Sequence, residues 1–432
     1  MSFIEVPEDH DFSYYNLPYG IFSTFNNPRK RPGVAIGDYV LDLDKVKHYF
    51  TGPLMKEVAA DVFNQSSLND FMALTPEHWH ETREYLKALL SKETPFLRDD
   101  KELRQQALHP IKDVEMHLPA KIGDYTDFYV ALSHAKNIGL MMRGPGNELM
   151  PNYRHLPVAY HGRASSIIVS GTPIARPSGQ YCPPGSDSPI FGPSKALDFE
   201  LEMGIFIGGK TNMVGQPIRM SDAERNLFGL VIMNDWSARD IQRWEYQPLG
   251  PFLAKNFATT ISPWVVTFEA LKDFKTDNYP QDPEPLPYLR HEDKFNFDIN
   301  LEVQYKPSQL SEAKTICKSN YKYLYWTAKQ MVAHHTVTGC NLNPGDMFGT
   351  GTISGPSEGS YGSMMELAWK GTKPILFDDN INRCYIEDGD EIIMRAYCRA
   401  KDYRVGFGEC SGLVLPSKLL QSRPSIVISE SK

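Results

Sequence analysis

The chain has 432 residues, 41% of them hydrophobic and 23% charged, which is enough for two or three domains with a sizeable core. The formal net charge is −8, the acidity is spread along the chain and no basic domain is visible, so we expect no nucleic acid partner. The six cysteines form no CxxC pair, and neither a signal peptide nor an apolar run of membrane-spanning length is visible. These features predict a cytoplasmic protein with reduced thiols and no membrane contact.

Residues 1–118 are predicted to form a domain of their own. Two β-rich runs within 33–43 predict a hairpin with a Gly-Asp turn, and a polar helix is predicted over 77–90. Residues 108–119 read as a linker. His78 and His80 are two positions apart, and helical periodicity points them to different faces, so a metal pair is not expected there. We expect this region to pack, cap or dimerise.

The region 119–420 is rich in predicted strands, and the pattern indicates a mostly antiparallel or mixed β domain. One helix is predicted over 321–337, and residues 421–432 form a Ser-rich tail that we expect to be mobile. The clearest alternating strands are predicted over 297–305, 391–398 and 405–408.

Three acidic residues, Asp198, Glu200 and Glu202, occupy alternate positions of the apolar run 197–203. Side chains on a β-strand alternate between faces, so these carboxylates should share one face, about 6.5–7 Å apart. Like charges buried without a partner cost on the order of several kcal/mol each. A hard divalent cation such as Ca²⁺ or Mg²⁺ would remove that cost. The alternative is a solvated strand face.

Asp235 follows the buried apolar run 229–233 and can supply a further oxygen ligand. If the next segment is helical, Arg239, Gln242 and Tyr246 fall on one face and could clamp a carboxylate or an oxyanion. In the alternative interpretation Asp235 is a helix cap and the residues after it form a solvated face.

Two further segments carry polar groups that could serve a site. A helix beginning near Asp127, itself a cap or a cation ligand, would place His134 two turns on; the alternative for His134 is a satisfied core histidine. The glycine-rich stretch 349–355 allows backbone amides to approach an anion, although without GK[ST] it is no P-loop and a plain turn is the alternative. Lys255, within an apolar run, needs an anionic partner if it points inward.

Several long motifs resemble the fumarylacetoacetate hydrolase family, and the resemblance covers nearly the whole chain. It implies a mainly β, α+β fold, with a small N-terminal SH3-like barrel in 1–118 and a large mixed β-roll of the family's fold in 119–420, acting as a homodimer. The motifs that carry it are Gly-Asp-Tyr-Thr-Asp-Phe-Tyr at 123–129, Tyr-His-Gly-Arg-Ala-Ser-Ser at 160–166, Leu-Asp-Phe-Glu-Leu-Glu at 197–202, Asn-Asp-Trp-Ser-Ala-Arg-Asp at 234–240, Thr-Thr-Ile-Ser-Pro-Trp at 259–264 and Gly-Thr-Ile-Ser-Gly at 351–355.

The resemblance implies hydrolysis of the carbon–carbon bond of 4-fumarylacetoacetate, a small β-diketo acid, to fumarate and acetoacetate in tyrosine and phenylalanine breakdown. Asp198 is not among the family's metal-ligand positions. The family has glycine where this chain has Ala258, beside the second cation. The implied ligands of a first cation, Ca²⁺ or Mg²⁺, are Asp127, Glu200, Glu202 and Asp235, and those of a second, Mg²⁺, are Asp235, Thr259 and Lys255 through its carbonyl oxygen.

The general-base position of the family falls on His134, oriented by Glu366. We expect Arg239, Gln242 and Lys255 to surround the oxyanion and the carbanion leaving group. Two rivals are another metal enzyme of the superfamily, such as an acylpyruvate hydrolase, decarboxylase or hydratase, and a non-catalytic calcium-binding module with His134 far from the carboxylates. The implied substrate contacts are Tyr129, Arg143, Tyr160, Gln242, Tyr246 and Thr352.

Overall fold

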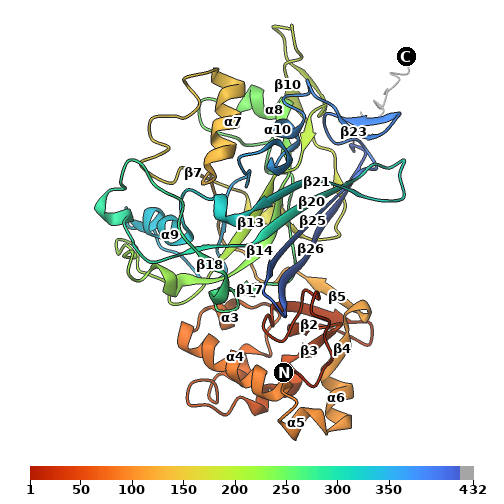
Figure 1. Ribbon diagram of the computed structural model, residues 1–432, viewed down its shortest axis with the longest axis vertical. Helices are drawn as coiled ribbons and strands as arrows, with labels where there is room; N and C mark the ends of the chain where they lie inside the picture. The colour runs from red at the N-terminus through yellow and green to blue at the C-terminus, as the bar shows by residue number, and fades with distance from the viewer. Residues whose placement is uncertain (419–432) are drawn as a thin grey trace, which may run out of the picture.

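Figure 1 shows two regions arranged along the long axis of the molecule, with the N-terminal part of the chain below and the rest above. The computed structural model describes residues 1–418, so the predicted tail at 421–432 lies outside the described residues. Among residues 1–418, no helix has the length and apolar character needed to cross a membrane. The fold is mainly β and of the α+β class, as expected.

The lower region contains one five-stranded sheet with the order β4-β3-β2-β1-β5. Gly37, with a φ of 51°, forms the turn of the predicted β2–β3 hairpin. The linker predicted over 108–119 is wrong, because β4 and β5 in this segment hydrogen-bond to β3 and β1 and complete the sheet. The strands are β1 (Tyr19–Thr24), β2 (Asn27–Ile36), β3 (Tyr39–Asp42), β4 (Leu108–Pro110) and β5 (Val114–His117).

Helices pack against one face of this sheet, and the hydrophobic core lies between the helices and the sheet. The polar helix predicted over 77–90 is confirmed as α4 (Pro76–Leu90). On it, His78 contacts the Thr75 hydroxyl and His80 contacts Glu269, so the two histidines diverge as expected. The shorter helices are α1 (Leu43–Val46), α2 (Ala59–Val62), α3 (Asn69–Met72), α5 (Pro95–Arg98) and α6 (Lys101–Ala107).

The upper region is built around an eight-stranded mixed sheet, in which seven strands follow the order β7-β6-β22-β13-β14-β16-β8 and β17 also pairs with β14. β6 runs parallel to β22, which is antiparallel to β13, and β13 is antiparallel to β14. The ends of β6, β22 and β14 therefore meet the start of β13 at one edge. The strands are β6 (Tyr125–Phe128), β7 (Ala159–His161), β8 (Ile167–Val169), β13 (Leu201–Ile207), β14 (Leu227–Asp235), β16 (Thr259–Ile261), β17 (Val266–Thr267) and β22 (Met347–Gly349).

A second sheet, with the order β21-β20-β25-β26-β9, packs beside the first. Buried and half-buried residues alternate along β20 and β25, as the predicted period of two requires. Its strands are β9 (Ile174–Ala175), β20 (Asn300–Lys306), β21 (Lys314–Asn320), β25 (Glu391–Arg399) and β26 (Arg404–Leu415). Four two-stranded ribbons complete the region: β10 (Ser178–Tyr181) with β11 (Ile190–Pro193), β12 (Leu197–Asp198) with β15 (Ser237–Ala238), β18 (Lys275–Thr276) with β19 (Asn296–Phe297), and β23 (Ile375–Asp378) with β24 (Ile381–Arg383).

The α-helices of the upper region are α7 (Leu132–Arg143), α8 (Arg239–Glu245), α9 (Ala328–Thr336) and α10 (Met364–Leu367). The helix predicted over 321–337 is shorter than expected. Thr327 caps the backbone of Gln330 while the Gln330 side chain bonds back, so this capping box fixes the start of α9 at Ala328. Residues 321–323 form a separate 3₁₀ turn.

The two regions share a hydrophobic core at their junction. Tyr19, Phe71 and Trp79 of the lower region pack against Phe228 of β14, with ring centroids of Trp79 and Phe228 5.1 Å apart. Aromatic residues packed edge to face in this way bury large apolar areas. The lower region therefore packs against the central sheet near the start of β14, whereas the acidic Asp235 lies at the other end of that strand.

Candidate active site

Three buried carboxylates from different strands converge at the edge where β6, β13 and β14 meet. Asp127, Glu202 and Asp235 each place an oxygen within 4.8 Å of the other two. Gly349, at the end of β22, lies between them. A Cβ at this position would approach Asp127 Oδ1 to 2.9 Å and Glu202 Oε2 to 3.0 Å. The glycine thus leaves space for the carboxylates to meet, and they can act together on one ligand.

Two carboxylates of this group, Asp127 and Glu202, are poorly compensated by the rest of the protein. Within residues 1–418, Asp127 Oδ1 and Glu202 Oε1 are buried without a hydrogen-bond partner. Burial, together with repulsion from Asp235, raises the pKa of Asp127 well above its usual range, and burial with the neighbouring Asp127 does the same to the pKa of Glu202. Carboxylate oxygens without a protein partner are the donors that hard divalent cations prefer, so these residues fit such a cation.

Glu200 is held differently from these three carboxylates. Its side chain contacts Lys255 Nζ and lies 2.7 Å from Arg239 Nη2. Burial alone would raise the pKa of Glu200, but the charges of Lys255 and Arg239 outweigh it and lower the pKa to about 2. Lys255 Nζ also donates to Asp235 Oδ2 at 2.6 Å, and Thr259 Oγ1 donates to Asp235 Oδ1 at 3.0 Å. The lysine predicted to need an anionic partner therefore has two.

The predicted run 197–203 is two short strands, because β12 ends at Asp198 and β13 begins at Leu201. Its apolar residues all lie in the core as expected, and Asp198 and Glu200 both contact the Arg239 guanidinium at 2.7 Å. The Asp198 carboxylate turns toward Arg239, whose Nε donates to it at 2.7 Å. It also accepts from the backbone amides of Met364 and Met365, at 2.7 and 3.1 Å. Asp198 orients Arg239 instead of joining the carboxylate group.

His134 and Glu366 form a buried pair next to the carboxylates. The helix predicted near Asp127 begins instead at Leu132, because Asp127 belongs to β6, and His134 lies in the first turn of α7. His134 Nδ1 is 2.8 Å from Glu366 Oε2. Burial acts to raise the pKa of Glu366, but the charge of His134 and the hydrogen bonds to this carboxylate bring its pKa below the usual value.

Three residues that complete this pair were not predicted from the sequence. Ser354 Oγ and Ser363 Oγ each donate to Glu366 Oε2 at 2.8 Å, and Asn137 Nδ2 donates to Glu366 Oε1 at 2.9 Å. Asn137 lies one turn after His134 on α7, so both side chains reach the same carboxylate. This spacing of three residues from His134 is the one sequence signal that could have indicated Asn137. The carboxylate is saturated, which fixes its position against His134.

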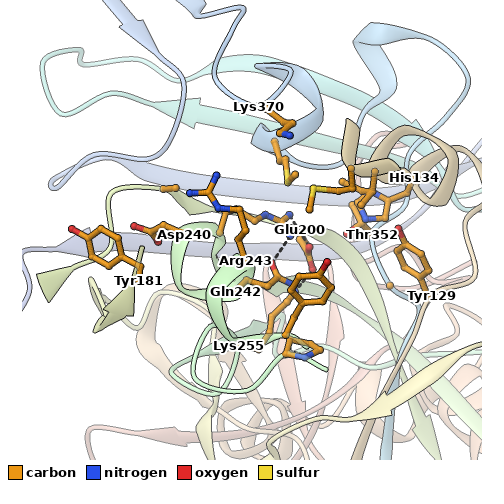
Figure 2. A pocket seen from close by; sticks show the side chains of 18 of the residues that line it. Tyr129, His134, Tyr181, Glu200, Asp240, Gln242, Arg243, Lys255, Thr352 and Lys370 are labelled. Atoms are coloured by element: carbon orange, nitrogen blue, oxygen red, sulfur yellow. Dashed lines mark hydrogen bonds and ion pairs between the residues drawn. The ribbon is translucent and has the colours of Figure 1, made fainter. Parts of the chain in front are cut away.

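A cavity of about 830 Å³ opens onto both groups. In Figure 2, Tyr129, His134 and Thr352 lie on one side, Tyr181 and Asp240 lie opposite, and Glu200 lies between them. Three predicted site residues do not line the cavity and lie behind the residues that do: Asp235, Thr259 and Glu366. The predicted site residues that line the cavity are Asp127, Tyr129, His134, Arg143, Tyr160, Glu200, Glu202, Arg239, Gln242, Tyr246, Lys255 and Thr352.

The predicted polar face of the segment after Asp235 is confirmed as part of this wall. Arg239, Gln242 and Tyr246, on α8 and at its C-cap, all line the cavity, and Arg239 Nη1 donates to Gln242 Oε1 at 3.1 Å. Arg143 lies at the mouth, where its Nε and Nη2 donate to the carbonyls of its own loop, at 2.8 and 2.7 Å. Residues of the wall that sequence reasoning missed include Tyr181, Lys195, Arg243, Lys370 and Tyr385.

Comparison with known proteins agrees with this architecture. Residues 125–414 match the family model described as fumarylacetoacetate hydrolase C-terminal, and residues 15–119 match the model described as fumarylacetoacetase N-terminal. The chain is 56% identical to fumarylacetoacetase from Homo sapiens over 97% of this chain and 100% of the relative. It is also 56% identical to fumarylacetoacetase from Bos taurus, over 96% of this chain and 99% of the relative.

Among solved structures, a fumarylacetoacetate hydrolase from psychrophilic Exiguobacterium antarcticum shares the fold, with a TM-score of 0.52 and 17% identity over 93% of this chain and 99% of that chain. Two family models cover both regions of the molecule, and the relatives match over nearly their full length. The chain belongs to the fumarylacetoacetate hydrolase family.

Proposed function

We propose that this protein hydrolyses the carbon–carbon bond of 4-fumarylacetoacetate to fumarate and acetoacetate, a step of tyrosine and phenylalanine breakdown. The observation that carries the proposal is the joint opening of a buried carboxylate group and the His134–Glu366 pair into one cavity. The relatives named fumarylacetoacetase, which match over nearly the full chain, support the choice of substrate.

The cation would be held by Asp127, Glu202 and Asp235 together with Glu200. When bound, a divalent ion supplies positive charge that polarises a carbonyl of the β-diketone. We assign Ca²⁺ to this first site, with Mg²⁺ as the alternative, since both prefer carboxylate oxygens. A second ion, Mg²⁺, is assigned to Asp235, Thr259 and the Lys255 carbonyl, where the neighbouring Ala258 replaces the family's glycine.

His134 acts as the general base in this proposal. The Glu366 carboxylate can only accept a hydrogen bond, so Nδ1 of His134 carries the proton and Nε2 presents its lone pair to the cavity. Nε2 takes a proton from water as the water oxygen adds to the carbonyl carbon next to the fumaryl double bond. Glu366 stabilises the imidazolium that forms.

Collapse of the adduct breaks the carbon–carbon bond. The electron pair of that bond moves onto the acetoacetate fragment as an enolate, and the proton held on His134 returns to the fragment's carbon. Arg239, Gln242 and Lys255 surround the oxyanion and the leaving enolate, where positive charge and hydrogen-bond donors lower the barrier. The substrate is oriented by Tyr129, Arg143, Tyr160, Gln242, Tyr246 and Thr352.

A metal-restoration assay tests the activity. Protein stripped of metal is assayed on fumarylacetoacetate, with Ca²⁺ and Mg²⁺ restored separately and together, by loss of diketone absorbance. We expect little turnover before restoration and recovery with at least one ion. A parallel panel of acylpyruvates tests the nearest rival. Preference for an acylpyruvate would contradict the proposed substrate, and turnover that ignores metal would contradict the proposed site.

Two statements about the whole protein belong to the same proposal. We propose that it acts as a homodimer in the cytoplasm, and that residues 1–118 and 119–420 are its domains. Exposed apolar side chains beside the cavity mouth support self-association, since Leu249 and Phe252 are 96% and 61% exposed. The molar mass of the purified protein, measured by light scattering, tests whether it is a dimer. A monomer at micromolar concentration would contradict it.

A further inference from the structure

A turn of unfavourable backbone conformation lies at the mouth of the cavity, directly after α10. Trp369, Lys370 and Gly371 have φ values of 45°, 57° and 81°. The left-handed region suits glycine, but a side chain makes it unfavourable, and Trp369 and Lys370 adopt it in succession. Such conformations persist where the surrounding structure imposes them, and they are enriched at functional sites.

The turn directs Lys370 toward the cavity. Its side chain is part of the cavity wall, and Figure 2 shows it on the opposite side of Glu200 from Lys255. Lys370 Nζ donates to the carbonyl of Met141 at 3.1 Å, in the last turn of α7. Because α7 carries His134 and α10 carries Glu366, the lysine stands where the two helices of the catalytic pair come together at the mouth.

The charge of Lys370 differs from the charges deeper in the cavity. Arg239 and Lys255 are both paired with Glu200. In the part of the chain that the structure describes, Lys370 Nζ has the neutral Met141 carbonyl as its partner and no carboxylate within ion-pair distance. Lys373, three residues on, is paired with Glu358 at 3.1 Å. Lys370 therefore offers an uncompensated positive charge to whatever enters the cavity.

The proposed substrate has a carboxylate at each end of its β-diketone and needs a cation for each. Arg143, two residues after Met141 and one of the proposed substrate contacts, can serve only one of the two carboxylates, and its Nε and Nη2 already donate to its own loop. We propose that Lys370 binds one terminal carboxylate of the substrate and is a specificity-determining residue for dicarboxylate β-diketones. The inference rests on the proposed function. A flexible ammonium group can leave a neutral carbonyl for a carboxylate at little cost, since charge-assisted hydrogen bonds are the stronger ones.

The first test compares Lys370→Gln with wild type in steady-state kinetics. We expect KM for fumarylacetoacetate to rise roughly tenfold, the size of one charge-assisted hydrogen bond, while kcat falls less than threefold. Lys370→Arg should restore most of the loss. For a β-diketone with a single carboxylate, wild type and Lys370→Gln should differ less than twofold. An unchanged KM for the dicarboxylate, or an equal rise for both substrates, overturns the inference.

Inhibition by the products identifies which end of the substrate is bound. Fumarate and acetoacetate are tested separately against wild type and Lys370→Gln, and a weakened inhibition constant for one of them assigns the carboxylate. Calorimetric titration with fumarate and acetoacetate gives the same answer without turnover. If wild type fails to hydrolyse fumarylacetoacetate, the proposed function falls, and the titrations alone decide the role of Lys370. Equal affinity of both proteins for both acids overturns it.

Two further variants separate recognition from stability. Lys370→Gly removes the side chain but relieves the backbone, so its melting temperature should equal or exceed that of wild type while its KM rises as in Lys370→Gln. Lys373→Gln is the matched control on the same turn and should leave KM unchanged. If Lys370 only clamps α7, Lys370→Gly should melt lower and lose kcat with an unaltered preference between substrates, and this result overturns the inference.

Discussion

Two buried acidic sites in this protein behave in opposite ways. Asp390 accepts hydrogen bonds from Arg383 Nε at 2.7 Å, from the amides of Ser308 and Glu387 at 2.9 and 3.0 Å, and from the Tyr305 hydroxyl. Although burial acts to raise the pKa of Asp390, these donors lower it. At the cavity, Asp127 and Glu202 keep oxygens without a partner, and their pKa values are raised.

The contrast separates a structural carboxylate from a functional one. The Asp390 network is complete in itself, so its role is to hold β20, β24 and the turn before β25 together. The cavity carboxylates Asp127 and Glu202 keep oxygens that a cation could bind, and the surrounding strands hold them close together despite their repulsion. Stability should therefore depend on the first site, and activity and metal binding on the second.

The largest expected effect is on stability, in Asp390→Ala. This change leaves the buried Arg383 without its main partner, which costs about 3–5 kcal/mol of the free energy of unfolding. Urea denaturation measures the loss, and turnover per folded molecule should stay near wild type. Asp388→Ala is the control, since the Asp388 side chain, which pairs with Arg176, is 42% exposed, and the change should cost less than about 1 kcal/mol. Equal losses of unfolding free energy in Asp390→Ala and Asp388→Ala would contradict the structural role assigned to Asp390.

The next effect is on activity, in His134→Ala. We expect turnover to fall by roughly 10²-fold or more, the usual contribution of a general base, with a small change in melting temperature. Turnover is followed as loss of diketone absorbance. The exposed His155 provides the control variant His155→Ala, which should be fully active. Near-normal turnover of His134→Ala would refute the assigned base.

Glu202→Gln tests the incomplete site directly. It removes one of the repelling charges without changing the shape of the side chain, so the metal-free protein should keep or gain stability. Affinity for Ca²⁺ or Mg²⁺ should fall by about 10-fold to 100-fold, measured by calorimetry. Glu302→Gln on β20, outside the cavity, should bind metal as wild type does. A Glu202→Gln protein with unchanged affinity is the result that contradicts the ligand assignment.

The smallest effect is on the pH dependence of stability. Because the folded pKa values of Asp127 and Glu202 are raised, the folded metal-free protein holds more protons than the unfolded chain above about pH 4. This contribution to stability is complete below that pH and is lost as pH rises through the raised pKa values.

Denaturation midpoints from pH 4.5 to 8 measure this slope, with and without saturating metal. We expect metal to flatten it, because the cation replaces the protons, and Glu202→Gln to reduce it in the metal-free protein. Slopes that are the same in the presence and absence of metal would show that the two acidic sites do not differ in the way described.

Local patterns in the sequence anticipated much of the architecture. The alternation of burial over 297–305, the Gly-Asp turn and the polar helix over 77–90 depend on contacts between near neighbours, and all three are confirmed. The strand predicted over 297–305 is divided, because β19 ends at Phe297 and β20 begins at Asn300. The polar face of Arg239, Gln242 and Tyr246 followed from helical spacing in the same way. The boundaries of α9 and the strands in 108–119 were missed, because a capping box and pairing with β1 and β3 decided them.

By itself, the sequence determined which residue types were available for chemistry and, through long family motifs, which of them to expect together. Only the tertiary structure decided which of these residues pair with one another and which keep polar atoms without a partner. Asp198 and Glu202 look equivalent in the sequence, yet Asp198 faces Arg239 whereas Glu202 faces the carboxylates of Asp127 and Asp235. Asn137, Ser354 and Lys370 acquire roles through neighbours that lie far along the chain. The physical reason is that charge compensation in a buried site depends on distance in space, and the strand order of the central sheet sets those distances.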